Sequence, residues 1–330
     1  MEESGNSFDN SFGNYSNAAT LPEIEVTISN NPSPGYLFMS NFPYTNIPNT
    51  PYLLMVKNDG SLYHSRELDS EALDYKKQSN GMLTYWYSNK YYAEDLQHNI
   101  IDSFYCGNGY STDQHELIIM DNGHALLMSY DPQIVDMSQI VAGGNPNAIV
   151  IGLIIQEIDE NKNVVFQWRS WDHIAITDAI HEDLTAPRVD YIHGNAIELD
   201  TDGNLMISSR HISEITKINR TTGAIIWRMG GVHNEFTFIN DPLQGFTYQH
   251  DIRRIANGNV TLYDNGNFHP VHFSRAVEYD LDEVNKTATL VWQYRHSPDI
   301  YGFAMGNVQR LENGNTLISW GSANANCNRS

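Results

Sequence analysis

The chain of 330 residues is poor in cysteine and in positive charge, and it has no long hydrophobic run. Its 19 Lys and Arg against 40 Asp and Glu give a formal charge of −21, which argues against nucleic acid and anionic membrane surfaces as partners. Because no apolar stretch reaches the roughly 18 residues that a membrane span needs, no transmembrane helix is predicted. An anionic ligand would therefore need a local positive site that works against the overall negative field.

The two ends of the chain add little chemistry. The first 20 residues are polar and rich in Ser and Asn, so we expect a disordered arm over 1–20 and one domain over 21–330. This arm does not resemble a secretory signal peptide as it stands. The two cysteines, Cys106 and Cys327, are compatible with a disulfide, but their spacing does not establish one.

What the chain does contain is a repeated unit of four short strands. Residues 195–228 run through the strand AIEL, the turn DTDGN, the strands LMISS and ITKI, the turn NRTTG and the strand AIIWR. The same order recurs over 115–169 and 250–295, and each fourth strand ends near a tryptophan: Trp168, Trp227 and Trp292. Two weaker units precede these three, around PYLLMVKNDGSLYHSREL and GMLTYWYSNKYYAEDL.

A further unit begins at NVQRLENGNTLISWG. These repeats predict an all-β fold, a β-propeller of six four-stranded blades whose last blade is incomplete in this chain. An N-terminal strand such as EIEVTI is a candidate to complete that blade. A β-sandwich or a jelly roll remains the structural alternative.

Polar residues recur at one position of this repeat. Four Asp/Asn-Gly turns follow the first strands, and eight residues before their glycines lie His115, Asn195, His250 and Gly306. In a propeller the first strand of each blade lines the central channel, so the first three side chains should converge at one mouth. Apolar residues would satisfy a structural repeat there, and the convergence of polar ones predicts a small-molecule site.

Two further residues join this predicted site. His193 precedes Asn195 by two positions, and Arg210 ends the next strand, which a hairpin brings back to the same end. An amide and a permanent cation at one end of a channel make a good receptor for an oxyanion.

Other polar residues are weaker candidates. Asp264 and Asn265 could orient His250, but we interpret them as ordinary turn residues, and His173 and His211 follow strand ends near the rim with no assigned role. Strand alternation places His115 and Glu116 on opposite faces. The histidines expected at the surface are His64, His98, His181, His269 and His272.

Three converging histidines would also suit zinc. The chain has no HxH or HxxxH chelate, and an arginine would share the pocket with the metal. Since Arg beside an anion is favourable and Arg beside a divalent cation is not, we predict an anion site with no metal and no cofactor.

Four motifs of the chain resemble those of the PAPS-independent arylsulfotransferase family: HGNAIELDTDGNLMISSRH, ITKINRTTGAIIWRMGG, FTYQHD and LYDNGN. The similarity extends over roughly 34–321 and includes PGYLFM and TDQHELIIMDNGHALL. The combination of H-x-N, SSR and QH is fairly specific, whereas the DGN hairpins occur in many propellers. The resemblance implies a six-bladed propeller that moves a sulfuryl group from a phenolic sulfate ester to an acceptor phenol.

The resemblance also implies roles for individual residues. It makes His250 the nucleophile of a ping-pong reaction through a sulfohistidine, His193 a further active-site histidine, and His115, Asn195 and Arg210 the sulfate-binding residues. It implies a periplasmic or secreted location and leaves the oligomeric state open, a homodimer included.

Chemically, His193 would serve as general acid and then base. Aromatic residues at the rim, among them Trp171, Phe246 and Tyr248, would stack on the phenol. Two other classes stay open: a non-catalytic binding propeller, and a quinone- or metal-dependent enzyme on the same scaffold.

Overall fold

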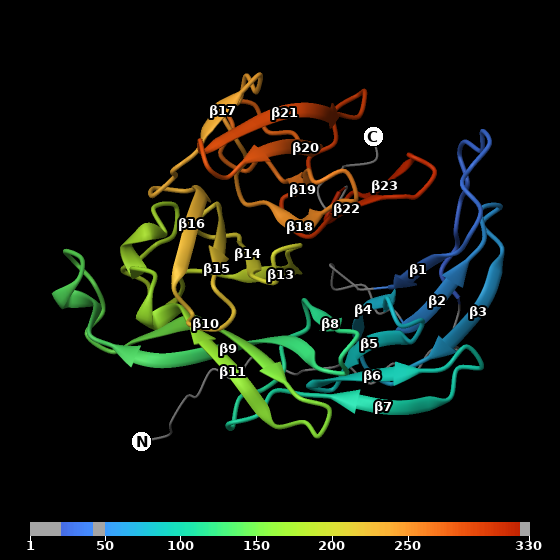
Figure 1. Cartoon of the computed structure of the whole chain (residues 1–330), viewed down its shortest axis with the longest axis horizontal. Helices are drawn as coiled ribbons and strands as arrows, with labels where there is room; N and C mark the ends of the chain where they lie inside the picture. The colour runs from blue at the N-terminus through green and yellow to red at the C-terminus, as the bar shows by residue number, and fades with distance from the viewer. Residues whose placement is uncertain (1–20, 42–49, 324–330) are drawn as a thin grey trace.

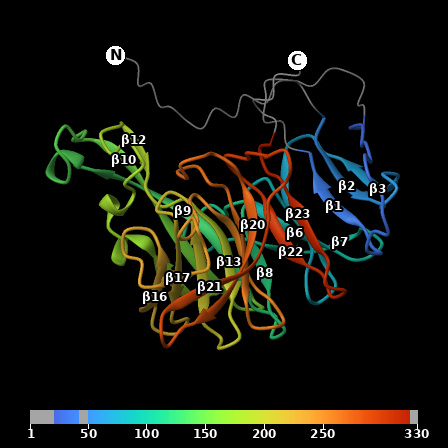
Figure 2. The same cartoon turned by 90° about the horizontal axis from the view of Figure 1, so that it is seen from above.

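The computed structural model describes residues 21–41 and 50–323, and it is an all-β propeller with almost no helix. Its sheets are arranged around a central axis (Figure 1), and the side view shows them standing next to one another around it (Figure 2). Five sheets form blades of three to five strands, and a sixth sheet has two strands.

The first two blades are built as antiparallel meanders in which each strand pairs with the next. The first contains β1 (Leu37–Ser40), β2 (Tyr52–Val56) and β3 (Leu62–Glu67). The second contains β4 (Ala72–Lys77), β5 (Leu83–Tyr87), β6 (Lys90–Glu94) and β7 (Ile100–Phe104).

The third blade is extended by two 11-residue strands. It contains β8 (Leu117–Ile119), β9 (Ala125–Val135), β10 (Ala148–Ile158) and β11 (Val164–Arg169), with β12 (Arg188–Asp190) parallel to β10. The loops of this blade hold three short 3₁₀ helices: η1 (Met137–Gln139), η2 (Ser170–Asp172) and η3 (Ile176–Asp178).

The remaining sheets complete the ring. The fourth blade contains β13 (Gly194–Leu199), β14 (Leu205–Ser209), β15 (Glu214–Ile218) and β16 (Ile225–Gly230). The fifth contains β18 (His250–Arg254), β19 (Val260–Asp264), β20 (Arg275–Asp282) and β21 (Thr287–Tyr294), with β17 (Thr237–Ile239) parallel to β21. The two-stranded sheet contains β22 (Asn307–Arg310) and β23 (Thr316–Ser319).

The propeller and its repeat were predicted correctly, but the expectation of six blades with four strands each is wrong. Within residues 21–41 and 50–323 the structure has five blades, and of these only the second and fourth have four strands; β12 and β17 add parallel strands to the third and fifth. The segment EIEVTI is not a strand. Its Ile24 instead packs beside β2, against Tyr52, Leu54 and Val56.

The hydrophobic core lies between neighbouring blades. One cluster joins Leu126 and Leu153 of the third blade to Ile197 and Ile207 of the fourth, and a similar cluster joins the fourth blade to the fifth. The predicted tryptophans tie these layers together. The indole N–H of Trp168 donates to the Gly223 carbonyl in the fourth blade (3.1 Å), and that of Trp227 donates to Glu283 beyond β20 (2.9 Å).

The innermost strands bring charged side chains together at the axis. Arg253 of β18 forms ion pairs with Glu116, immediately before β8, and with Asp251, and it lies 3.7 Å from Glu198 of β13. Lys76 of β4 pairs with Glu116 and with Asp74. We call these six residues the axial cluster.

The structure describes one of the two cysteines and none of the predicted N-terminal arm. Cys106 is a buried free thiol whose Sγ lies 3.3 Å from the Met128 carbonyl, and Cys327 lies outside the described residues. The predicted arm, 1–20, also lies outside them. Across 21–41 and 50–323, no helix is both long and apolar enough to cross a bilayer.

The axial cluster makes a prediction about stability. Burial raises the pKa of Glu198 from 4.5 to about 7, and Arg253 opposes this shift only in part. The stability that proton binding at Glu198 contributes is complete below pH 4.5 and is lost as the pH rises through 7. Glu198→Gln, which mimics the protonated acid, should therefore stabilise the protein at pH 8 by at most about 3 kcal/mol.

Thermal unfolding followed by circular dichroism at pH 5 and pH 8 measures this effect. The gain in Tm should be larger at pH 8 than at pH 5, and the exposed control Glu160→Gln should change neither value. An equal or lower Tm for Glu198→Gln at pH 8 would contradict the prediction.

Candidate functional site

The predicted site residues come together at the inner ends of the blades. The rings of His115 and His193 lie 5.3 Å apart between centroids, edge to face. Asn195 donates its side-chain N–H to the Gln249 carbonyl (2.8 Å), which places it beside His250. Arg210 donates its backbone N–H to the His193 carbonyl (2.9 Å).

Electrostatic coupling connects these residues to His250. The pKa of His250 falls well below 6.5, mainly because the ring is buried, and the charges of Arg210, His193 and His115 lower it further. All five predicted residues thus belong to one cluster, contributed by the third, fourth and fifth blades.

Asn265, which we had interpreted as a turn residue, fixes the tautomer of His250. Its amide nitrogen donates to the carbonyls of Gly302 (2.7 Å) and Met305 (2.9 Å), so its oxygen must face the His250 ring. That oxygen lies 2.8 Å from His250 Nδ1, which we therefore assign as the protonated nitrogen. The lone pair of His250 is consequently on Nε2, where the Met305 backbone N–H donates to it (3.2 Å).

The other two histidines have carboxylate partners at the same ring atom. His115 Nδ1 lies 2.6 Å from Asp113 Oδ1, and His193 Nδ1 lies 2.8 Å from Asp190 Oδ2. Burial opposes the charge on His115, yet Asp113 and its hydrogen bond raise the pKa of His115 above 6.5. The pKa values of His115 and His250 are therefore shifted in opposite directions although both rings are buried in one site.

Contacts with His211, Phe303 and Tyr248 help to hold the guanidinium of Arg210. Its Nη1 lies 2.7 Å from His211 Nε2, and its Nη2 donates to the Phe303 carbonyl (3.0 Å). Its Cζ lies 4.3 Å from the centroid of the Tyr248 ring, which is a cation–π contact. The cation therefore has a fixed position beside His193 and His250, as a receptor for an anion requires.

The segment 301–306, which sequence reasoning had not connected with the site, lies against it. Its carbonyls and N–H groups bind Arg210, Asn265 and His250. Gly306 ends the segment with φ +105°, and a Cβ at this position would come within 2.5 Å of the Tyr263 ring. The fourth equivalent position is thus glycine because the backbone approaches an aromatic ring there.

Among the aromatic candidates, only Tyr248 contacts a predicted site residue. Phe246 is buried in the core between the fourth and fifth blades, and Trp171 packs on Tyr191. Tyr248 contacts both Arg210 and His211.

The prediction that His269 lies at the surface is wrong, because this side chain is buried and bonds Asp264 (2.8 Å).

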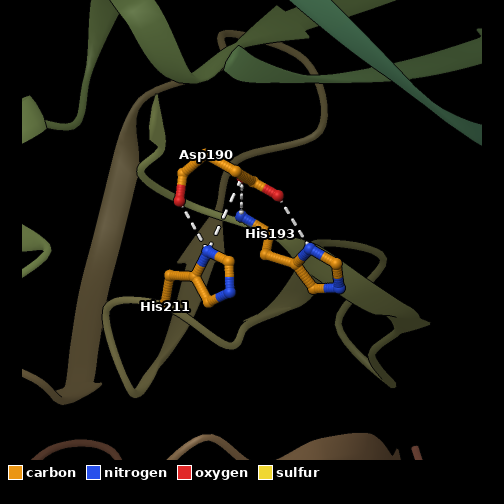
Figure 3. A group of neighbouring side chains, drawn as sticks. All are labelled: Asp190, His193 and His211. Carbon is orange, nitrogen blue, oxygen red and sulfur yellow. Dashed lines mark hydrogen bonds and ion pairs between the residues drawn. The ribbon is translucent and has the colours of Figure 1, made fainter. Parts of the chain in front are cut away.

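One group of side chains has the composition of a metal site. Asp190, His193 and His211 present ligand atoms within 4.8 Å of one another (Figure 3). Both Nδ1 atoms, however, face oxygen atoms of Asp190, and Arg210 lies against the other nitrogen of His211. Because a guanidinium at this distance opposes a divalent cation, the arrangement suits a hydrogen-bonded chain better than a metal site. The absence of a metal stays a prediction.

Short sequence spacings could have indicated the two carboxylates. Asp113 precedes His115 by two residues and Asp190 precedes His193 by three, so each pair is local. No sequence signal distinguishes Asn265 from the other turn asparagines, since its role depends on carbonyls that come from 302–305.

The carboxylate partner of His115 gives a direct prediction. In Asp113→Asn, burial remains while the negative charge is lost, so the pKa of His115 should fall from above 6.5 to below it. An NMR titration of the histidine Cε1–H resonances measures this shift. The exposed control Asp121→Asn should leave the His115 titration unchanged, and a pKa that stays above 6.5 in Asp113→Asn would contradict the assignment.

Comparison with solved structures supports the fold. A protein of unknown function from Bacteroides caccae aligns with a TM-score of 0.52 and 12% identity, covering 87% of this chain and 83% of that one. A catalytically inactive virginiamycin B lyase from Staphylococcus aureus, solved with quinupristin, aligns at 0.42 with 11% identity, covering 87% and 89%. At 12% identity the first similarity concerns the fold alone, and the second, with its TM-score below 0.5, carries no argument.

Comparison of sequences identifies the family. No curated protein sequence matches the chain. The model of the Arylsulfotransferase (ASST) family matches residues 27–330, a range that includes the whole cluster described above. The chain therefore belongs to the arylsulfotransferase family.

Proposed function

We propose that this protein is a PAPS-independent aryl-sulfate sulfotransferase that carries the sulfuryl group on His250 Nε2. Family membership supports a sulfotransferase activity. The observation that carries the mechanism is the difference between the histidine partners: His115 and His193 each have a carboxylate at Nδ1, whereas His250 has a neutral amide. A neutral imidazole whose lone pair is on Nε2 is a competent nucleophile at neutral pH.

In the first half-reaction, Arg210 and a protonated His115 would bind the sulfate group of the donor ester. The His250 Nε2–S bond forms as the S–O bond to the phenol breaks, and His193 Nε2 donates a proton to the departing phenolate. By analogy with phosphoryl transfer, the transition state is loose and places charge on the non-bridging oxygens. Preorganised donors stabilise that charge, as in an oxyanion hole.

Two backbone and side-chain groups support this step. The Met305 N–H that now donates to Nε2 would lose its acceptor when the N–S bond forms, and it becomes a donor available to a sulfuryl oxygen. Asn195 uses one amide hydrogen for the Gln249 carbonyl and keeps a second for the ligand.

The second half-reaction reverses the first with an acceptor phenol in place of the product. His193 now removes the phenol proton, the new S–O bond forms, and the N–S bond to His250 breaks. One pocket serves both phenols in turn, so the kinetics should be ping-pong. A periplasmic or secreted location, as implied by the resemblance, stays a prediction.

The first test removes the nucleophile. Wild-type protein should release nitrophenolate from p-nitrophenyl sulfate at pH 8 in a phenol-dependent way, and mass spectrometry without acid should find a sulfuryl group on the peptide that carries His250. His250→Ala should lose about 10⁴-fold or more in rate and the modification together. The control His124→Ala removes a histidine that bonds Glu157 outside the site and should keep both. Absence of release from folded wild-type protein would favour the binding-propeller alternative.

The second test changes only the partner of His250. In Asn265→Asp a carboxylate would replace the amide oxygen and raise the pKa of His250, so a larger fraction would be protonated and unreactive. The rate of the donor half-reaction at pH 7 should fall at least about tenfold and recover in part as the pH rises.

The control Asn267→Asp adds the same charge two residues away, on a side chain that bonds the Phe303 carbonyl and not His250. It should shift the pH profile much less. Equal shifts in the two variants would mean that any negative charge added near the site changes the pKa of His250, and that the partner of Nδ1 has no special effect.

A further inference from the structure

His211, for which sequence reasoning had assigned no role, lies between the anion receptor and the acid–base histidine. It directly follows Arg210 at the end of β14, and its backbone N–H donates to the Ile192 carbonyl (3.2 Å). Its ring lies 4.8 Å from that of His193 between centroids. Figure 3 shows His193 and His211 both facing Asp190. The side chain of His211 is only 11% exposed, so its ring nitrogens must be satisfied by protein groups and not by bulk water.

The two ring nitrogens of His211 have partners that determine its tautomer. Nδ1 lies 2.5 Å from the Asp190 carbonyl oxygen, which only accepts, so Nδ1 must carry the proton. Nε2 lies 2.7 Å from Arg210 Nη1, a group that only donates, so Nε2 must be unprotonated. Both contacts form together only when the imidazole is neutral.

The surroundings keep His211 in that neutral form. Burial lowers the pKa of His211 to about 4, and the charges of His193 and Arg210 act in the same direction. The carboxylates of Asp190 and Glu182 oppose this shift without reversing it. His211 therefore accepts from Arg210 throughout the neutral pH range.

The contact matters because it gives the guanidinium of Arg210 a hydrogen-bond acceptor at Nη1 in addition to the one at Nη2. The Phe303 carbonyl accepts from Nη2, and Cζ lies 4.3 Å from the centroid of the Tyr248 ring. Contact with a ring leaves rotation in the plane open, whereas hydrogen bonds at both Nη1 and Nη2 restrict it. Loss of this bond would remove one of the two hydrogen bonds that direct the guanidinium donors.

We propose that His211 is a positioning residue of this site: its neutral ring accepts from Arg210 and donates to the Asp190 backbone, and so couples the anion-binding arginine to the Asp190–His193 pair. The kinetic part of this inference rests on the proposed sulfotransferase function. The anion-binding part does not, because it concerns the direction of Arg210 alone.

A double-mutant cycle on the binding of inorganic sulfate tests the coupling without turnover. His211→Leu should weaken sulfate binding, measured by isothermal titration calorimetry, by about tenfold. In an Arg210→Met background the same change should alter it less than about twofold, because the residue would act through Arg210. His211→Gln, whose amide oxygen can accept from Arg210, should restore most of the affinity.

The kinetic arm uses p-nitrophenyl sulfate with a phenol acceptor. His211→Leu should raise the KM of the donor and lower kcat, and His211→Gln should recover both in part. His124→Leu serves as the matched control, since it removes another histidine that bonds an acidic residue but lies outside the site. Its sulfate affinity and KM should equal those of the wild type.

The outcomes separate the two proposals. Equal losses from His211→Leu with and without Arg210, or no rescue by glutamine in a protein with wild-type Tm, would overturn the positioning role. An Arg210-dependent loss of sulfate binding in a protein that does not transfer sulfuryl groups would keep the positioning role and overturn the proposed function.

Discussion

The structure depends on a constraint that the propeller imposes at its axis: polar side chains from different blades meet there and must satisfy one another. Each blade buries its apolar faces against its neighbours, as the clusters between the third, fourth and fifth blades show. The inner ends of the strands have no such apolar partner. Carboxylates and cations of the axial cluster therefore pair across blades. The site histidines instead pair with Asp113, Asp190 and Asn265, which lie close by in the chain or on the adjoining strand, and these pairings determine which ring nitrogen carries a proton.

The chemistry of the site follows from these pairings. His115, His193 and His250 all present Nδ1 to an oxygen, so each has Nε2 on the other side of the ring, where that of His250 accepts from the Met305 N–H. The oxygen belongs to a carboxylate in the first two and to an amide in the third. One residue type thus occurs with a raised pKa at His115 and a lowered pKa at His250 in the same small volume, and in the proposed reaction the first binds the anion while the second attacks it.

Much of the site could be predicted from the sequence because its signals are local. Equal offsets from turn glycines identified His115, Asn195 and His250, and the hairpin that returns from Asn195 identified Arg210. The repeat also predicted the propeller. The predicted number of strands per blade was wrong because β12 and β17 come from loop regions and pair in parallel with their blades. The repeat identifies only antiparallel hairpins, so it does not predict these two strands. Asn265, His211 and the segment 301–306 were missed because their roles arise from contacts far apart in the chain.

The axial cluster has a consequence for how a charged substrate would be oriented. Four acidic residues face two cations just beyond the histidines, and burial raises the pKa of both Asp74 and Glu198 to about 7. An anion that moved from Arg210 toward the axial cluster would meet increasing negative potential, so the cluster would repel it. In the proposed reaction, the sulfate end of a donor would therefore stop at the histidines, with its aryl end toward Tyr248. This repulsion would increase as the pH rises through neutrality, because Asp74 and Glu198 then lose their protons.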